Sequence, residues 1–178
     1  LPRRVLAGEH GWWDFDVSEK GICIITLGGD QVCFGFRSGD VYLQQSCKDR
    51  VKITAHDGPV LALALLRSGE LCSGSADGDI RICTGGKYHG QSLSGHSGKV
   101  LWLVELKPGC LCSGSSEGVI FVWSEHERRN WKSKAIPVPA LTTGVQLPNG
   151  WLLTGSARGE VAVWQLAERL PDTGSALN

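Results

Sequence analysis

One stretch of the chain, residues 93–123, contains the three side-chain types of a serine hydrolase. It carries His96, Ser113, Ser115 and Glu117, and it ends at Trp123. A serine nucleophile needs an adjacent histidine base, an acid that orients the base, an exposed hydroxyl and an oxyanion pocket. Residue types alone leave two interpretations open, which are catalysis and internal hydrogen bonding.

A second set of the same residue types occurs 40 residues earlier in the chain. His56 precedes His96 by that distance, and Ser73, Ser75 and Asp77 follow His56 at the spacing of the later set. An active site does not need to recur at a fixed period, whereas a structural repeat does. We therefore expect these side chains to form hydrogen bonds inside a repeated fold rather than to act on a substrate.

Four segments of the chain align without gaps, namely residues 31–44, 70–83, 110–123 and 151–164. Two glycines and the closing residue of each segment step along the chain by 39, 40 and 41 residues. Each segment reads as a β-hairpin, because an apolar run leads through a glycine turn into a second apolar run rich in β-branched residues. The repeat is therefore built from β-strands.

Further apolar runs precede the hairpins, and they are near-continuous, which is typical of strands covered on both faces. Another strand fits between the repeats, for example at residues 50–54 and 90–94. Each unit of about 40 residues is thus predicted to supply a four-stranded antiparallel sheet. Such a sheet cannot cover two apolar faces alone, so an all-β fold of radially stacked sheets is expected.

The third unit carries the residues of a known motif. Gly95 and His96 open it, a Ser-Gly-Ser run and an acidic turn residue follow, and Trp123 closes it. This pattern resembles the WD-repeat β-propeller family, and the resemblance covers the chain from about Gly21 to Leu166. It implies β-propeller blades of four antiparallel strands, with about four to four and a half blades in this chain, as a partial or partner-completed propeller.

The repeats depart from the family pattern at several positions. No unit ends in Trp-Asp, since Ser124 follows Trp123 and Gln165 follows Trp164, and the fourth unit has no Gly-His pair. The resemblance implies a hydrogen-bonded structural tetrad of a histidine, a strand serine or threonine, an acidic turn residue and a tryptophan. The residues that would supply it here are His56, Ser73, Ser75, Asp77, His96, Ser113, Ser115, Glu117, Trp123 and Trp164.

The repeat also predicts domain boundaries. They are residues 1–20, a partial N-terminal blade or preceding strands; 21–44, the core of blade 1; 45–83, blade 2; 84–123, blade 3; 124–166, blade 4; and 167–178, a C-terminal tail. Family members normally close a ring of around seven blades, whereas an arc of four would expose two apolar faces. The chain could be part of a longer protein, could close against another chain, or could form a compact four-bladed ring.

Composition restricts the function further. Lys plus Arg equals Asp plus Glu at 18 each, which argues against a basic field over the whole domain. Seven cysteines lie mostly in apolar stretches, so we expect reduced, buried thiols in a cytoplasmic or nuclear protein. Zinc is the rival explanation, but a single residue separates Cys110 from Cys112. We expect no metal, no cofactor, no membrane association and no small-molecule substrate.

Two segments and one set of turns are candidate partner contacts. The segment 126–134 gathers Arg128, Arg129 and Lys132 around Trp131, which suits a solvated loop, an acidic protein or RNA. Trp12 and Trp13 are adjacent, so both cannot point to the same side of a strand. The turns carry Arg37, Pro59, Lys99 and Arg158.

The predicted function is a non-catalytic protein–protein interaction scaffold in a multi-subunit complex. One alternative is an RNA- or ribonucleoprotein-associated propeller that contacts RNA through the basic loop 126–134. The other alternative, an enzyme on a propeller scaffold, is disfavoured because strands expected to line the channel, such as residues 60–66, carry only apolar groups.

Overall fold

The computed structural model describes residues 21–29, 31–45, 49–84, 87–126 and 130–165, together with the backbone of two short strands, β1 (Arg4–Leu6) and β2 (Trp12–Asp14). These residues form β-strands and turns. No membrane-spanning helix occurs within them.

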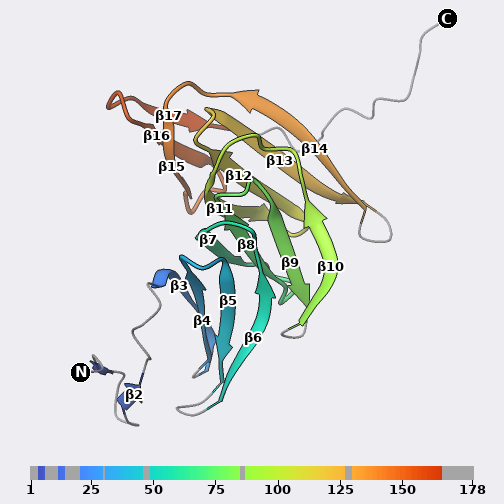
Figure 1. The fold of residues 1–178 in the computed structure, drawn as a ribbon. Helices are drawn as coiled ribbons and strands as arrows, with labels where there is room; N and C mark the ends of the chain where they lie inside the picture. The colour runs from blue at the N-terminus through green and yellow to red at the C-terminus, as the bar shows by residue number, and fades with distance from the viewer. Residues whose placement is uncertain are drawn as a thin grey trace, which may run out of the picture.

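Four antiparallel sheets follow one another in chain order (Figure 1). Sheet 1 contains β3 (Gly21–Gly28), β4 (Gln31–Phe36), β5 (Asp40–Gln44) and β6 (Arg50–Ala55). Sheet 2 contains β7 (Val60–Leu65), β8 (Leu71–Ser75), β9 (Ile80–Thr84) and β10 (Lys87–Leu93). Sheet 3 contains β11 (Val100–Lys107), β12 (Cys110–Ser115), β13 (Val119–His126) and β14 (Asn130–Pro137). Sheet 4 contains β15 (Leu141–Gln146), β16 (Leu152–Ser156) and β17 (Val161–Trp164).

The predicted all-β architecture of antiparallel propeller blades is confirmed. Sheets 1 to 3 have four strands each, and sheet 4 has three strands within the described residues. β1 and β2 form a separate two-stranded sheet.

The sheets stack side by side into an open arc. Each inner strand packs on the sheet before it: β7 contacts β3 and β4, β11 contacts β7 and β8, and β15 contacts β11 and β12. Sheet 1 and sheet 4 lie at opposite ends of the arc (Figure 1). The described residues therefore form a partial propeller rather than a closed ring.

The hydrogen-bonded sheets are offset from the sequence repeat by one strand. The strand that opens each unit after the first pairs with the sheet before it, as β6 pairs with β5, β10 with β9 and β14 with β13. The predicted boundaries at residues 45, 84 and 124 follow the repeat. Residue 45 comes directly after β5, residue 84 is the last residue of β9, and residue 124 lies inside β13, so each boundary falls at or near the end of the third strand of a sheet. Each repeat unit after the first therefore contributes its first strand to one sheet and its other strands to the next sheet.

The basic segment differs from the predicted loop. Residues 130–137 form β14, which pairs with β13 along its whole length from Asn130↔His126 to Pro137↔Val119. The hairpin is longer than the sequence suggested because both strands continue beyond Trp123. Most of the segment is therefore the outer strand of sheet 3.

Three apolar clusters fill the spaces between the sheets. The cluster between sheets 1 and 2 contains Cys33, Val41, Leu43, Ile53, Val60, Leu71 and Cys83. The other two clusters join sheet 2 to sheet 3 and sheet 3 to sheet 4. Cysteines contribute to all three, and the six cysteines that the structure describes are free thiols. Burial is the main cause that raises the pKa of Cys33, to about 12, so this thiol stays protonated and packs as a small apolar group.

A repeated glycine allows the sheets to approach one another closely. A Cβ atom at Gly74 would lie 2.5 Å from the Val100 side chain of the next sheet, and one at Gly35 would lie 2.6 Å from Val60. Both distances are too short for a real contact. The glycine at this repeat position in sheets 1 and 2 is therefore required by packing between sheets.

We predict that Gly74→Ala lowers the free energy of unfolding by about 1–3 kcal/mol, because the new methyl group overpacks the space that Val100 fills. Gly155→Ala is the matched control, since it holds the same repeat position in sheet 4, where Thr143 is the nearest neighbour at 3.1 Å. Urea unfolding of both variants measures the difference. Equal losses would contradict the packing role of Gly74.

Candidate functional site

Two neighbouring sheets hold the His-Ser-acid sets. In the later set, His96 lies in the loop between β10 and β11, Ser113 in β12, Glu117 in the turn after β12, and Trp123 in β13. The loop before β11 and the turn after β12 lie at the same end of sheet 3, because consecutive strands are antiparallel. This topology brings the histidine against the strand serine and the acidic turn.

These four side chains form one continuous chain of hydrogen bonds. Trp123 Nε1–H donates to Ser113 Oγ over 2.8 Å, and Ser113 Oγ lies 2.7 Å from His96 Nε2. His96 Nδ1 lies 2.8 Å from Glu117 Oε1. Because Ser113 accepts from Trp123, its own proton is free to go to Nε2, and the neutral imidazole then donates from Nδ1 to the carboxylate.

The charges in this set follow from burial and hydrogen bonding. Burial is the main cause that lowers the pKa of His96 below its ordinary 6.5, although Glu117 opposes this shift. Partial burial alone would raise the pKa of Glu117, but hydrogen bonds from Ser97, His96 and Ser115 outweigh it and lower the pKa to about 2. A neutral imidazole therefore faces an ionised carboxylate at neutral pH.

The serine, histidine and acid are hydrogen-bonded in the same order as in a serine hydrolase, but the serine is not accessible to a substrate. Ser113 is 0% exposed and the His96 side chain is also 0% exposed. The Ser113 hydroxyl oxygen also accepts the Trp123 indole N–H. A substrate carbonyl cannot reach this hydroxyl without opening the sheet, so the geometry supports internal fastening rather than nucleophilic attack.

The earlier set, in sheet 2, repeats the arrangement without the tryptophan. His56 Nε2 lies 2.8 Å from Ser73 Oγ, and His56 Nδ1 lies 3.2 Å from Asp77 Oδ2. Asp77 also accepts the backbone N–H of Asp57 over 3.0 Å. Cys83 stands at the tryptophan position and packs in the apolar cluster between sheets 1 and 2. Burial is again the main cause that lowers the pKa of the histidine.

The second serine of each Ser-Gly-Ser run holds the turn instead of the histidine. Ser75 Oγ donates to the Gly58 carbonyl over 2.9 Å, and Ser115 Oγ donates to Glu117 over 3.0 Å. The backbone N–H of the acidic turn residue donates to the same serine oxygen in both sheets. The two serines of a run therefore have different partners.

Sheet 4 retains the hydrogen bond between the tryptophan and the strand hydroxyl but has no histidine. Trp164 Nε1–H donates to Thr154 Oγ1 over 2.8 Å. Pro137 stands 41 residues after His96, so the histidine position is not filled by a polar side chain. Thr154 was not among the predicted site residues, although its place 41 residues after Ser113 was a usable signal.

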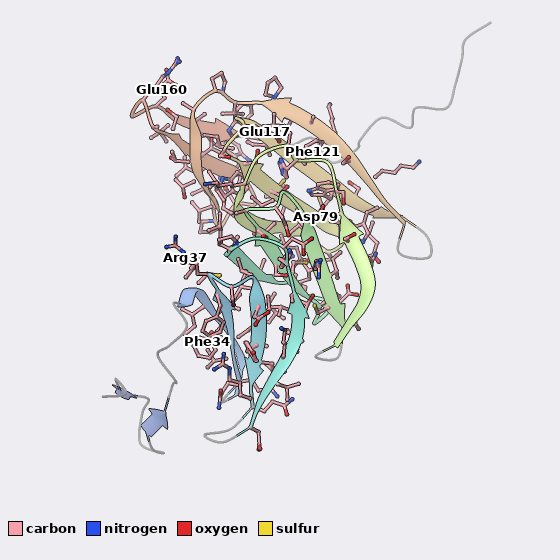
Figure 2. All side chains as sticks on the ribbon, viewed as in Figure 1. Phe34, Arg37, Asp79, Glu117, Phe121 and Glu160 are labelled. Carbon is pink, nitrogen blue, oxygen red and sulfur yellow. The ribbon has the colours of Figure 1, made fainter. Side chains whose placement is uncertain are left out.

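The predicted turn contacts gather at one end of the sheets. Arg37, Lys99 and Arg158 are exposed and Pro59 is half-buried. The backbone N–H groups of the neighbouring turns donate to the carbonyls of Pro59 and Lys99 over 2.8 Å and 2.9 Å, which fixes these loops. We call this end the turn-side face, and Figure 2 shows Arg37 and Glu160 projecting from it.

The basic segment presents charge but not an aromatic surface. Lys132 and Lys134 are exposed on β14, whereas Trp131 is half-buried and packs against the cluster between sheets 2 and 3. Arg128 and Arg129, and the side chains of Trp12 and Trp13, lie outside the described residues. Within the described part of the chain, no three His, Cys, Asp or Glu side chains are grouped as a metal-binding set.

Comparison with known proteins identifies the fold. Residues 47–83 match the family model "WD domain, G-beta repeat", and this match falls within the second predicted unit. A search of curated proteins finds no match. The chain therefore contains a WD40 repeat.

Solved structures share the architecture at low sequence identity. The computationally designed Ika4 protein is 19% identical with a TM-score of 0.67, over 84% of this chain and 93% of that chain. The computationally designed Ika8 protein is 22% identical with a TM-score of 0.66, over 82% of this chain and 45% of that chain. The C-terminal WD40 domain of Sif2 is 21% identical with a TM-score of 0.68, over 79% and 42%. The predicted WD-repeat β-propeller is confirmed, and the chain spans less than half the length of the Ika8 and Sif2 chains.

We predict that Ser113→Ala lowers the free energy of unfolding by about 2–3 kcal/mol, because it leaves the buried Trp123 N–H and His96 Nε2 without a partner. Ser73→Ala should cost about half as much, since only His56 depends on that hydroxyl. Chemical denaturation of both variants gives the comparison. A smaller loss for Ser113→Ala than for Ser73→Ala would contradict the shared role of Ser113.

Stability should fall as the pH drops below about 6.5. The pKa values of His56 and His96 are lower in the folded protein than the ordinary 6.5, so the unfolded chain binds protons first on acidification. The loss should deepen toward pH 2, where Glu117 is protonated. Urea midpoints between pH 8 and pH 5 measure the slope, and the double variant His56→Gln, His96→Gln should be less stable but flatter. A slope unchanged in that variant would assign the pH dependence to other groups.

Proposed function

We propose that this protein is a non-catalytic scaffold that binds other proteins within a multi-subunit complex. The observation that carries the proposal is the use of the reactive residue types as buried internal hydrogen bonds in sheets 2 and 3. The WD40 repeat typically mediates contacts between proteins, and the chain contains one at residues 47–83. Loops held on a rigid scaffold are well suited to recognition.

The turn-side face is the proposed binding surface. Arg37, Lys99 and Arg158 are exposed cations on three different sheets or their connecting loops. Pro59 and Lys99 occupy the same repeat position, and the backbone hydrogen bonds to their carbonyls restrict the loops. A partner segment that offers carboxylates can pair with these three cations, because an exposed arginine or lysine pairs with a carboxylate at little cost in desolvation.

The cytoplasm or the nucleus is the proposed location. All six described cysteines are free, and five of them are buried in the apolar clusters or beside them. Reduced thiols of this kind are typical of reducing compartments.

RNA binding is the weaker alternative. Lys132 and Lys134 could contact phosphates, but Trp131 packs against the core instead of offering a face on which a base could stack. The proposal therefore places protein contacts on the turn-side face first.

Charge reversal tests the two surfaces against each other. The variant R37E/K99E/R158E should lose partners that the wild-type chain retains in quantitative co-purification, because three exposed cations become anions. The variant K132E/K134E is the matched control on β14. With a purified partner, we expect binding at least about tenfold weaker for the first variant and within about twofold for the second.

Two results would overturn this assignment. If the turn-side variant retains every partner at wild-type affinity, that face is not the binding surface. The RNA alternative replaces the proposal if only K132E/K134E loses a bound molecule and that molecule is RNA. The binding of RNA to this variant should then depend less on salt concentration than its binding to the wild-type chain.

A further inference from the structure

The exposed large apolar side chains of the chain gather at its two ends. Seven occur in the described part: Ile22, Ile24, Val51, Val145, Trp151, Val161 and Val163. Two are in β3 of sheet 1, and four are in or beside the strands of sheet 4. Val51 is in β6 of sheet 1, so all seven belong to the terminal sheets of the arc, each of which has a neighbouring sheet on one face only within the described residues.

The exposed face of sheet 4 repeats a face that is buried elsewhere. We call the face of a sheet that packs on the following sheet its front face, and the opposite one its back face. Each front face carries a stripe of three paired residues from its first three strands. The stripes are Ile25–Cys33–Leu43, Ala64–Cys72–Ile82, Val104–Cys112–Val122 and Val145–Leu153–Val163.

The fourth stripe is apolar but uncovered. Ile82 and Val122 are 2% and 6% exposed, whereas Val163 at the same position in sheet 4 is 52% exposed. Val161 is 70% exposed, while Ile80 and Ile120 at its position are 0% and 1% exposed. Sheet 4 thus keeps the side chains of a junction between sheets, although no sheet follows it among the described residues.

The back face of sheet 1 has the side chains that such a junction needs. Ile24 and Val32 stand 39 residues before Leu63 and Leu71, which pack into the cluster between sheets 1 and 2 from the back face of sheet 2. Ile24 is 65% exposed and pairs with Phe34, which points to the same face. The two ends of the arc therefore present the two halves of one kind of junction.

Within the part of the chain that the structure describes, sheet 4 has no outer strand of the kind that a following unit would bring. At each internal junction, the outer strand of one sheet lies directly before the inner strand of the next, as β6 lies before β7 and β14 before β15. β2 holds this place before β3, since it begins nine residues ahead of it and β6 begins ten residues ahead of β7. A second unit that docks through its sheet 1 would thus place its β2 beside β17, which is the edge strand of sheet 4 among the described residues.

We propose that two copies of this chain close into one ring, with the front face of sheet 4 in each copy packed on the back face of sheet 1 in the other. Within one copy these faces lie at opposite ends of the arc (Figure 1). The chain spans 42% of the Sif2 WD40 chain and 45% of the Ika8 chain, so two copies approach the length of either. This assembly is independent of the turn-side face.

One position in the proposed junction is not filled. Val60 and Val100 fit over Gly35 and Gly74 of the preceding sheets. In a junction between copies, Gly155 would meet Gly21, which stands 39 residues before Val60. The junction therefore has one large side chain fewer than the junctions between sheets 1 and 2 and between sheets 2 and 3, and it should dissociate measurably on dilution.

Analytical ultracentrifugation of the full chain tests the proposal. The expected result is a dimer of twice the 19.1 kDa chain mass that dissociates on dilution. Val163→Lys and Ile24→Lys should each weaken it about a hundredfold or more, because each places a charge in both junctions. Val51→Lys is the matched control, since Val51 is 46% exposed on β6 and outside both faces. Circular dichroism confirms that each variant remains folded.

A gain of affinity separates this junction from non-specific association. Gly21→Val should tighten the dimer about tenfold per junction, the effect of burying one valine side chain over Gly155. A Cβ atom at Gly21 has its nearest neighbour, Phe36, at 3.9 Å, so the folded chain accepts the substitution.

Mixing the two lysine variants should give a heterodimer, since the pair retains one intact junction. A folded monomer at all concentrations, open polymers, or a dimer unaffected by Val163→Lys and Ile24→Lys would overturn the proposal.

Discussion

A β-sheet with two apolar faces must be covered on both, and this constraint organises the whole chain. Sheets 2 and 3 satisfy it through their neighbours, and every residue of their front-face stripes except the half-buried Val104 is buried. The requirement also explains Gly35 and Gly74, because the inner strand of the next sheet lies directly against them. Burial of apolar surface between sheets, at roughly 25 cal/mol per Å², is the main stabilising contribution.

The polar residues follow from the same packing. Once neighbouring sheets close over β8 and β12, the hydroxyl and imidazole groups there lose water and need partners within the protein. The chain Trp123–Ser113–His96–Glu117 supplies a partner for each member, and its acidic end stays at the surface where a carboxylate can remain ionised. Residues that resemble a hydrolase relay are thus explained by the cost of burying polar atoms.

The sequence was sufficient to predict the structural features that recur in every repeat. It was not sufficient to predict contacts that depend on how one particular pair of strands is aligned. The 39 to 41-residue period predicted strands at β7 and β11, and the resemblance predicted partners for His96 that lie within hydrogen-bonding distance in the structure. Trp131 was expected in a loop because it falls in the polar connection after Trp123, yet β14 pairs with β13 and Trp131 packs against the core. Trp102 lies between Gly114 and Gly144, a contact set by the spacing of two sheets.

The one-strand offset between repeat and sheet has a consequence for how such a chain can lengthen. A duplication that begins and ends at the end of a third strand, as at residues 45 and 84, copies an outer strand together with the three strands that follow it. The inserted copy completes the sheet before it and leaves its own sheet to be completed by the next unit. Every seam between old and new segments then falls near the end of a third strand and outside the inner strands that pack on the preceding sheet, so arcs of different blade number can arise by recombination without opening a core.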